Sequence, residues 1–298
     1  MRSLMTLILG LMTLLPGIVA AADYPTQYPF PQSRLQSGPE IRFCIDKRNP
    51  TWSTQKAIAE EIALSLGRPT EFYVTHKASE ASGYQVASTR KEFLVHLATH
   101  CDAYMGLPGS TTAAFDYPAD EEMLASRPYY RTSFVLVSRD PDVSSLTNLP
   151  SDALLALQGR GVPYLLLMTT RPDSVQVKRF QSTEAIVSAL LAGEVDHGVV
   201  YAPQLYAQVE DPAAEGLHVH PVTSLPNMDW YVFVGLRSDR PTLRQKFDDA
   251  IVRLLENGRL ARILADHSLP TEVFQPAAVD AELPDDDFGA DDDDEDDT

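Results

Sequence analysis

The sequence predicts an α/β protein of two lobes that two crossover strands join, and three observations lead to this prediction. Segments typical of strands and helices alternate along residues 41–109 and again along residues 164–209. Between the two runs lies a strongly apolar, strand-like segment, TSFVLVSR at residues 132–139. A second such segment, WYVFVGL at residues 230–236, follows the later run. Two similar α/β units connected by these two strands account for the pattern.

The first unit is expected to have the order β-α-β-α-β. Residues 41–45 alternate as a short strand does, and residues 54–66 repeat apolar side chains at helical spacing. A strand, a helix and an apolar strand are then predicted at residues 71–75, 91–99 and 102–107. Strands that helices connect in this way pair in parallel, so the loops after the strands share one edge of the sheet. We expect binding residues at that edge.

The second unit repeats this order. After the strand at 132–139, the sequence predicts a turn at 158–161, a buried strand at Tyr164 to Met168, a helix at 183–191, a strand at 198–201 and a short helix at 203–209. Residues 241–265, beyond the strand at 230–236, have the apolar spacing of two helices. We therefore place lobe 1 at residues 41–131 plus 237–270, and lobe 2, with its crossover strands, at residues 132–236.

The N-terminus has the three parts of a secretory signal peptide. Arg2 supplies the positive charge, residues 4–19 form an apolar stretch, and residues 20–22 are alanines suited to cleavage. A Pro-rich polar arm, residues 23–40, follows at once, so the apolar stretch is not expected to remain as a membrane span. We predict a signal peptide at residues 1–22, no membrane span after its cleavage, and a mature protein in the periplasm.

The acidity of the chain is concentrated at its C-terminus. The formal net charge is −18, but residues 280–298 hold twelve carboxylates and no base, so the rest, with 24 basic and 30 acidic residues, carries −6. A body this mildly acidic lacks the basic stripe that nucleic acid requires, which excludes that class of partner. We interpret residues 271–298 as a disordered, solubilising tail, because they repel one another and contain little apolar mass.

Cys44 and Cys101 are the only cysteines. An exported protein meets an oxidising compartment, where such a pair tends to close, so we predict one disulfide between them. Neither residue belongs to a CxxC motif, and a lone pair of cysteines 57 residues apart does not have the fixed ligand spacing of a metal motif, which argues against catalytic thiol chemistry and against a metal site.

Three stretches, together with the order of elements, resemble a known family. They are CDAYMGLPG at residues 101–109, SRPYYRTSFVLV at residues 126–137 and ALLAGEVDHGVVYAP at residues 189–203. Residues 41–269 resemble the bacterial solute-binding protein family 3, whose two α/β lobes close on a ligand. The resemblance implies a class II periplasmic binding protein-like fold.

One branch of that family resembles the chain more specifically. The spacing CD-x-x-MG-x-P followed by RPYYR, and the segment from Leu236 to Pro270, are similar to the branch that accompanies periplasmic quinoprotein methanol dehydrogenases. This implies an accessory protein for a PQQ-dependent alcohol dehydrogenase, with that enzyme as partner and no cofactor of its own. The alternatives are a substrate-binding receptor of an ABC transporter for a small solute and a periplasmic enzyme on the same fold, for which Asp46 and Glu122 are the candidate carboxylates.

Loops at the expected binding edge, and arginines and aromatics near the crossovers, are the candidates for a ligand or partner cleft. They are Asp46, Trp52, Leu107, Arg127, Tyr129, Tyr130, Arg131, Arg171 and Tyr201. Amino-acid-binding relatives carry an arginine shortly after the Met-Gly, because a guanidinium holds a carboxylate bidentately. Residues 106–117 contain no base, which argues against an ordinary amino acid ligand unless Arg127, Arg131 or Arg171 substitutes. Tyr129 and Tyr130 are expected to face the cleft or to pack between the lobes, and Trp52 to form a cleft wall or a surface cap.

Histidines offer no catalytic or metal motif. Asp196 and His197 lack a GxSxG nucleophile elbow, and the remaining histidines lack HExxH spacing. We interpret His218 and His220 as residues of a solvated edge strand, and we expect neither catalytic residues nor a bound metal.

Overall fold

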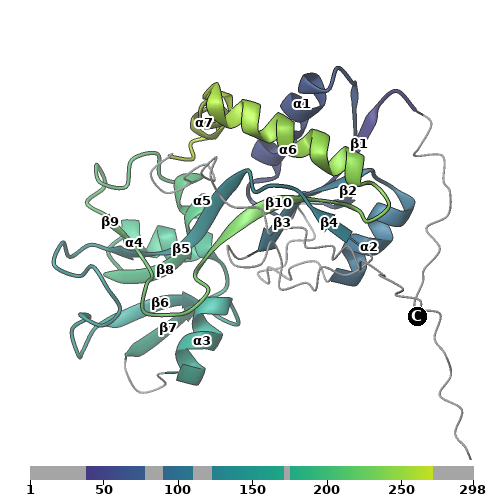
Figure 1. Cartoon of the computed structure of the whole chain (residues 1–298). Helices are drawn as coiled ribbons and strands as arrows, with labels where there is room; N and C mark the ends of the chain where they lie inside the picture. The colour runs from purple at the N-terminus through teal and green to yellow at the C-terminus, as the bar shows by residue number, and fades with distance from the viewer. Residues whose placement is uncertain (1–37, 78–89, 110–122, 171–174, 271–298) are drawn as a thin grey trace, which may run out of the picture. The chain divides into compact units, whose positions relative to one another are not determined.

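A single mixed sheet runs through the described part of the chain (Figure 1). The computed structural model describes residues 38–77, 90–109, 123–170 and 175–270. Within these residues the strand order is β2-β1-β3-β10-β5-β8-β6-β7, with β4 beside β10 and β9 beside β5. The described residues belong to one compact unit that starts at Gln32.

The first part of the sheet has the predicted order. Strand β1 (Ile41–Asp46) pairs in parallel with β2 (Thr70–His76) and with β3 (Ala103–Gly109). Helices α1 (Trp52–Ser65) and α2 (Arg90–Thr99) connect these strands. The loops that follow β1 and β3 therefore leave the same edge, as expected for parallel strands.

The second part contains one element whose type the sequence analysis predicted wrongly. Strands β6 (Leu154–Gln158), β7 (Gln176–Phe180) and β8 (His197–Tyr201) are parallel, and helix α4 (Thr183–Leu191) lies where it was predicted. The predicted strand at Tyr164 to Met168 is wrong, because these residues lie in helix α3 (Val162–Thr170). Leu167 is 2% exposed and Leu165 is 52% exposed, so only one face of the apolar run is buried, as in a surface helix.

Two crossover strands connect the two parts. Strand β5 (Tyr130–Ser138) and strand β10 (Asp229–Arg237) pair with each other in antiparallel fashion, and β10 also pairs with β3 and with the short β4 (Met123–Ala125). Strand β5 continues against β8 and against β9 (His218–Pro221), which is an edge strand as predicted. The prediction of two α/β lobes joined by two crossover strands is confirmed, while the exact lobe boundaries at 131/132 and 236/237 stay a prediction.

The last two helices return to the first lobe. Helix α6 (Pro241–Glu256) and helix α7 (Arg259–Asp266) both contact α1, and Figure 1 shows them beside it. Pro241 starts α6, where its fixed φ suits a first helical turn. In the second lobe, Ser182 caps α4 by accepting a hydrogen bond from the Ala185 N–H at 3.2 Å, and α5 (Ala202–Tyr206) directly follows β8.

The predicted disulfide is present. Cys44 of β1 and Cys101, just before β3, are bonded, and both are fully buried. They pack in a small core with Phe93, Tyr104 and Leu107, among other residues. The bond thus ties the start of β3 to the central strand of lobe 1.

Several predictions concern residues outside those described. The signal peptide (1–22), most of the arm (23–40), the acidic tail (271–298), Arg171 and Glu122 all fall in these segments. Among the helices that the structure does describe, none combines the length and apolar character needed to cross a bilayer.

Candidate functional site

A buried group of uncharged polar side chains lies where the loop after β1, strand β3, the crossover β5 and the end of β8 meet. We call it the hydroxyl cluster, and it consists of Thr51, Gln55, Tyr129, Tyr130, Thr132 and Tyr201, with the backbone N–H of Gly106. Each of the six side chains belongs to a residue that is at most 5% exposed. The cluster brings together three of the predicted site residues, Tyr129, Tyr130 and Tyr201.

Hydrogen bonds tie the crossover strand to lobe 1 through this cluster. The Tyr130 hydroxyl lies 2.8 Å from Thr51 Oγ1, and Gln55 Nε2 donates to the same oxygen at 3.1 Å. The Gly106 N–H donates to the Tyr129 hydroxyl at 3.0 Å. The two tyrosine rings lie edge to face, with centroids 5.1 Å apart. The tyrosines are therefore held in packed positions by these contacts.

The local sequence explains the positions of Thr51 and Gln55. Asn49 Oδ1 accepts hydrogen bonds from both the backbone N–H and the hydroxyl of Thr51, at 3.0 and 2.9 Å, and so turns the chain into α1. Gln55 follows Thr51 by four residues, which puts both side chains on one face of the helix.

Gly106 meets a backbone requirement in the middle of β3. Its φ is +88°, a value that side chains disfavour. An added Cβ would lie 2.6 Å from Gln55 Nε2, so the Gln55 amide packs directly on the glycine. The positive φ and this close contact together require glycine at this position.

Burial controls the ionisation of the cluster. Desolvation raises the pKa of Tyr129, Tyr130 and Tyr201 above the ordinary tyrosine value. The three hydroxyls accordingly keep their protons across the physiological range, and the cluster carries no charge.

Aromatic rings flank the cluster on the side of the second lobe. Tyr201 stacks on Trp230 of β10, with centroids 5.5 Å apart and an angle of 11° between the planes. Phe134 contacts both rings at 5.7 and 5.6 Å. In the sheet register, Trp230 stands opposite Thr132. Trp230 is half-buried, so the stack connects the cluster to the surface.

Asp46, at the end of β1, is already paired. Arg48 Nη2 lies 2.6 Å from its Oδ2, the Arg48 N–H donates to Oδ1 at 2.9 Å, and His76 Nδ1 lies 3.3 Å from Oδ2. Burial alone would raise the pKa of Asp46, but the hydrogen bonds and the charge of Arg48 outweigh it and lower the pKa. Asp46 is thus a stably ionised carboxylate.

Two of the predicted arginines, Arg131 and Arg127, have defined partners, Arg131 through its side chain and Arg127 through its backbone. Arg131 forms an ion pair with Asp229 at the surface, and its guanidinium lies 5.8 Å from the centre of the Tyr231 ring. The backbone N–H of Arg127 donates to Asp248 of α6 at 2.6 Å. Neither arginine hydrogen bonds to the hydroxyl cluster within the described residues.

The other predicted site residues have separate roles. Leu107 is fully buried in the core around the disulfide, so it belongs to the interior of lobe 1. Trp52 is half-buried at the start of α1, and Lys47 Nζ lies 4.8 Å above its ring. Trp52 directly follows Thr51 in the chain, and its side chain packs against the main hydrophobic core.

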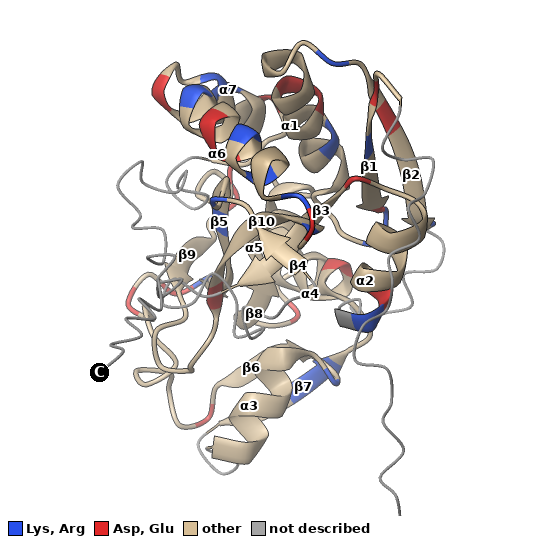
Figure 2. Cartoon of the chain, turned by 45° about the vertical axis from the view of Figure 1, so that its right-hand side comes forward, with Lys and Arg blue, Asp and Glu red and all other residues tan. Residues whose placement is uncertain are grey.

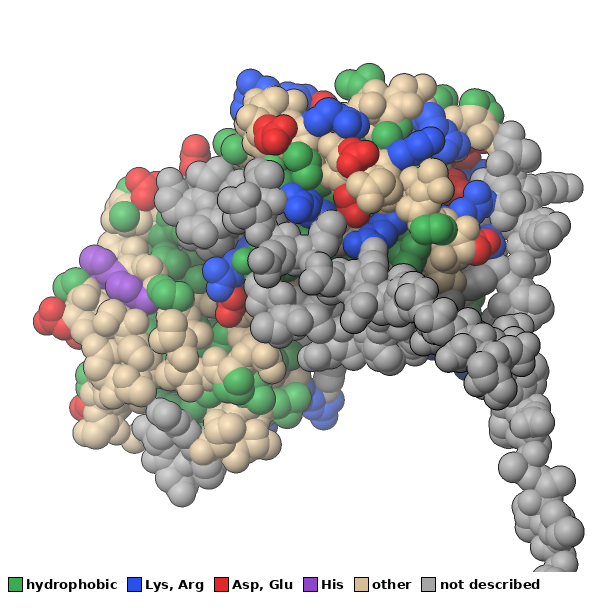
Figure 3. Space-filling view, in the orientation of Figure 1, with side chains coloured by type: hydrophobic (Ala, Val, Ile, Leu, Met, Phe, Trp, Pro, Cys, Tyr) green, Lys and Arg blue, Asp and Glu red, His purple; other side chains and the backbone are tan. Residues whose placement is uncertain are grey.

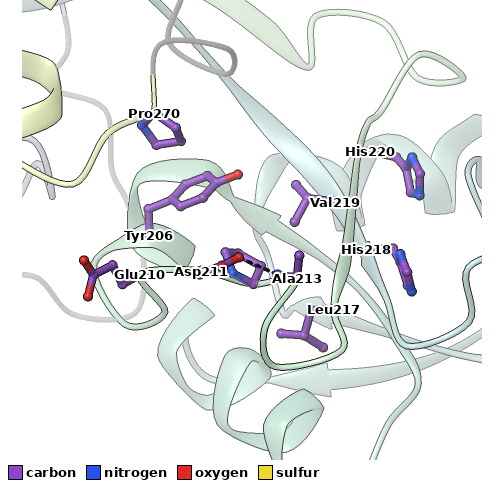
Figure 4. Close-up of a pocket in the computed structure, with 10 residues that line it drawn as sticks. Tyr206, Glu210, Asp211, Ala213, Leu217, His218, Val219, His220 and Pro270 are labelled. Atoms are coloured by element: carbon purple, nitrogen blue, oxygen red, sulfur yellow. Dashed lines mark hydrogen bonds between the residues drawn. The ribbon is translucent and has the colours of Figure 1, made fainter.

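A separate surface pocket of about 410 Å³ lies beside α5 and β9. Tyr206, Leu217, Val219 and Pro270 contribute to its lining, and none of the site residues predicted from the sequence does. Figure 4 shows the rings of His218 and His220 on the other side of β9 from Tyr206. Within the described ranges no three His, Cys, Asp or Glu side chains are grouped to hold a metal ion.

Ser138 and His197 form a buried pair whose hydrogen bonds serve the structure of the protein. Ser138 Oγ lies 3.0 Å from His197 Nδ1 and donates to the Asp140 carbonyl at 2.8 Å. Both side chains are buried, with His197 4% exposed, and burial lowers the pKa of His197. The serine proton is directed to the backbone, so the pair does not form an accessible nucleophile.

Surface charge is mixed rather than sorted by sign. Lys and Arg alternate with Asp and Glu along α6 (Figure 2), and the same mixture covers the upper part of the face in Figure 3. Lys56 and Glu60 of α1 illustrate it as an exposed i, i+4 pair at 3.3 Å. The described surface of these helices therefore offers little to attract a polyanion.

Sequence reasoning missed Thr51, Gln55, Gly106 and Thr132. One signal was present for Gln55, which follows Thr51 at helical spacing on the face that also buries Ile58 and Ile62. A polar residue on an apolar helix face must find a buried partner, which marks it for attention.

Comparisons with known proteins show the fold. Substrate-binding domain 2 of Lactococcus lactis GlnP, in an open conformation, matches with a TM-score of 0.56 at 13% identity, over 78% of this chain and 96% of that one. A Streptococcus pneumoniae amino acid ABC transporter substrate-binding protein bound to L-arginine matches with a TM-score of 0.50 at 21% identity, over 78% and 95%. No family model matches the chain, and no curated protein sequence matches it. The chain has the fold of type II periplasmic binding proteins.

Proposed function

We propose that the chain is a periplasmic substrate-binding receptor that delivers a small solute to an ABC importer. The observation that carries the proposal is the hydroxyl cluster, which lies at the loop after β1 and at the end of β8, against the middle of β3 and the crossover β5. In α/β sheets, ligands bind outside the carboxyl ends of the strands. The L. lactis and S. pneumoniae proteins, which share the fold, are a substrate-binding domain and an amino acid transporter receptor.

An enzymatic role is less well supported. A carboxylic acid that donates a proton near neutral pH needs a raised pKa, whereas Arg48 and His76 hold Asp46 in its ionised form. Ser138 and His197 are buried and committed to neighbours. These two sites, as they stand, offer neither a general acid nor an accessible nucleophile.

The accessory role beside a quinoprotein alcohol dehydrogenase ranks second. It depends on the sequence resemblance of three stretches, which supply β3, the segment leading into β5, and the last two helices, α6 and α7. Tyr129 and Tyr130 of that segment are engaged inside the protein, so they are not available to a partner's surface in this conformation.

Calorimetry of the purified mature protein tests the proposal. The protein is titrated with amino acids, organic acids, polyols and amides, and is used in parallel to capture a purified PQQ-dependent alcohol dehydrogenase. Micromolar binding of one solute without capture of the dehydrogenase supports the receptor. Capture of the dehydrogenase without binding of any solute would overturn it in favour of the accessory role.

A further inference from the structure

We infer that the solute is an uncharged molecule that carries hydroxyl or primary amide groups, and that it binds at Gln55, Tyr129 and Thr132 of the hydroxyl cluster. This inference rests on the proposed receptor function and names the chemical class of its ligand. It follows from counting which hydrogen-bonding positions of the cluster are occupied and which are open.

Thr51 is fully used. Its hydroxyl donates to Asn49 Oδ1, so its two lone pairs must accept the hydrogen bonds from the Tyr130 hydroxyl and from Gln55 Nε2. Tyr130 is therefore the donor in its contact with Thr51. Neither the Thr51 hydroxyl nor the proton of Tyr130 is left for a ligand.

Three hydrogen-bonding groups of the cluster, one acceptor and two hydroxyl donors, have no partner for this role among the described residues. Gln55 Oε1 is buried and accepts no hydrogen bond. Tyr129 accepts from the Gly106 N–H, and no described acceptor receives its proton. Thr132 Oγ1, beside the Tyr201 hydroxyl, makes no hydrogen bond of normal length and angle. The cluster thus presents one amide acceptor and two hydroxyl groups that can donate.

A ligand that both donates and accepts, without charge, matches these positions. A hydroxyl or a primary amide gives a proton to Gln55 Oε1 and accepts one from Tyr129 or Thr132. Buried polar groups in folded proteins almost always have partners, so open positions on residues at most 1% exposed indicate a missing polar guest.

A charged ligand lacks a counter-charge here. No Asp, Glu, Lys, Arg or His hydrogen bonds to the six side chains in the part of the chain described. Two of the charges predicted to line the cleft are already compensated, because Asp46 pairs with Arg48 and Arg131 pairs with Asp229. Burying a zwitterion or a carboxylate beside neutral hydroxyls costs more than burying a neutral molecule of the same size.

Matched pairs of solutes test the inference by calorimetry. Each pair differs mainly in charge: glycerol against glycerate, propanamide against propanoate, and myo-inositol against glucuronate. Arginine and glutamine complete the panel. We expect at least one neutral member to bind and its charged counterpart to bind at least tenfold more weakly.

Two pairs of variants locate the binding. Gln55→Met removes the open acceptor at nearly constant volume, and Gln204→Met is its matched control, because Gln204 Oε1 is also buried without a partner but belongs to α5. Thr132→Val removes a hydroxyl that Thr132→Ser keeps. We expect Gln55→Met and Thr132→Val to weaken binding of the neutral solute at least tenfold, and both controls to stay within twofold of the unmodified protein. If Gln55→Met does not fold, the comparison of Thr132→Val with Thr132→Ser tests the inference by itself.

The outcomes separate the inference from the proposed function. Tighter binding of an amino acid or carboxylate than of its neutral counterpart overturns the inference and leaves the receptor standing. Neutral binding that both Gln55→Met and Thr132→Val leave unchanged also overturns it, because the site then lies elsewhere. Absence of binding across the panel overturns both, and indicates that buried water alone fills the open positions.

Discussion

Replacing Gly106 by alanine tests the packing at the centre of the hydroxyl cluster. Two effects add at this position. A left-handed φ costs a side chain about 1–2 kcal/mol, and Gly106 has a φ of +88°. Forcing a methyl group into a filled interior costs about 1–3 kcal/mol more, and here the new Cβ would lie 2.6 Å from Gln55 Nε2. Gly106→Ala should therefore lower the free energy of unfolding by about 2–5 kcal/mol.

Gly216→Ala provides the control for backbone strain. Its φ is +71°, and an added Cβ meets nothing within 4 Å, so this substitution should cost about 1–2 kcal/mol from backbone strain alone. The gain from a stiffer unfolded chain is common to both variants and cancels in the comparison. Urea denaturation followed by circular dichroism measures both free energies.

A double variant isolates the contact with Gln55. Gln55→Ala removes the amide that the new methyl group would meet, so Gly106→Ala should cost less in that background, and the difference gives the crowding energy. If Gly106→Ala proves no more destabilising than Gly216→Ala, or costs the same with and without Gln55, the proposed packing of the amide on Gly106 is incorrect.

Three further predictions follow from the structure. Reducing the bond between Cys44 and Cys101 should lower the free energy of unfolding by about 4 kcal/mol, because the chain-entropy model assigns this value to a closed loop of 57 residues. Thermal melting with and without reductant measures the loss. Two free thiols in the unfolded, unreduced protein would contradict the bond. Burial lowers the pKa of His197 in the folded state, so its contribution to stability is complete above the unfolded value of 6.5 and is lost as pH falls below it; His197→Gln should flatten the dependence of the urea midpoint on pH in that window, and an unchanged slope would refute the assignment. Arg131→Ala should cost less than about 1 kcal/mol, because Arg131 and Asp229 are 42% and 47% exposed, and a larger loss in urea denaturation would show that Arg131 has a further role.

Periodicity was sufficient to predict most of the fold. The helix at 183–191 was placed at its observed bounds, and the two apolar segments at 132–139 and 230–236 are the two crossover strands. Such strands can be recognised in a sequence because a central strand is buried on both faces and is therefore almost continuously apolar.

The hydrophobic pattern did not determine whether a short apolar run forms a strand or a helix. The run at Tyr164 to Met168 has no period, so it fits a buried strand or a helix equally, and Pro163 at the start of the helix was the missed signal. Strand β7 (Gln176–Phe180) is partly exposed and contains charged residues, so its hydrophobic pattern was too weak to detect.

The candidate site depended on contacts that sequence does not encode locally. Tyr130 and Thr51 are 79 residues apart, and Tyr129 and Gly106 are 23 apart, so their hydrogen bonds exist only once the crossover strand has packed on lobe 1. The sequence pattern identified Tyr129 and Tyr130 as candidate site residues, because large aromatic side chains with hydroxyls suit binding sites. It did not reveal that their hydroxyls are bonded or that Gln55 and Thr132 hold the open positions.

Tryptophan fluorescence tests the central claim most directly. The chain has two tryptophans, Trp52 and Trp230. Trp230 stacks on Tyr201, so its ring borders the hydroxyl cluster, and Trp52 directly follows Thr51 in the chain. Binding of the solute at the cluster should change the emission saturably, with the same affinity that calorimetry gives, and Trp230→Phe should remove part of the change. A solute that binds by calorimetry but leaves the emission of both tryptophans unchanged would show that the hydroxyl cluster is not the binding site.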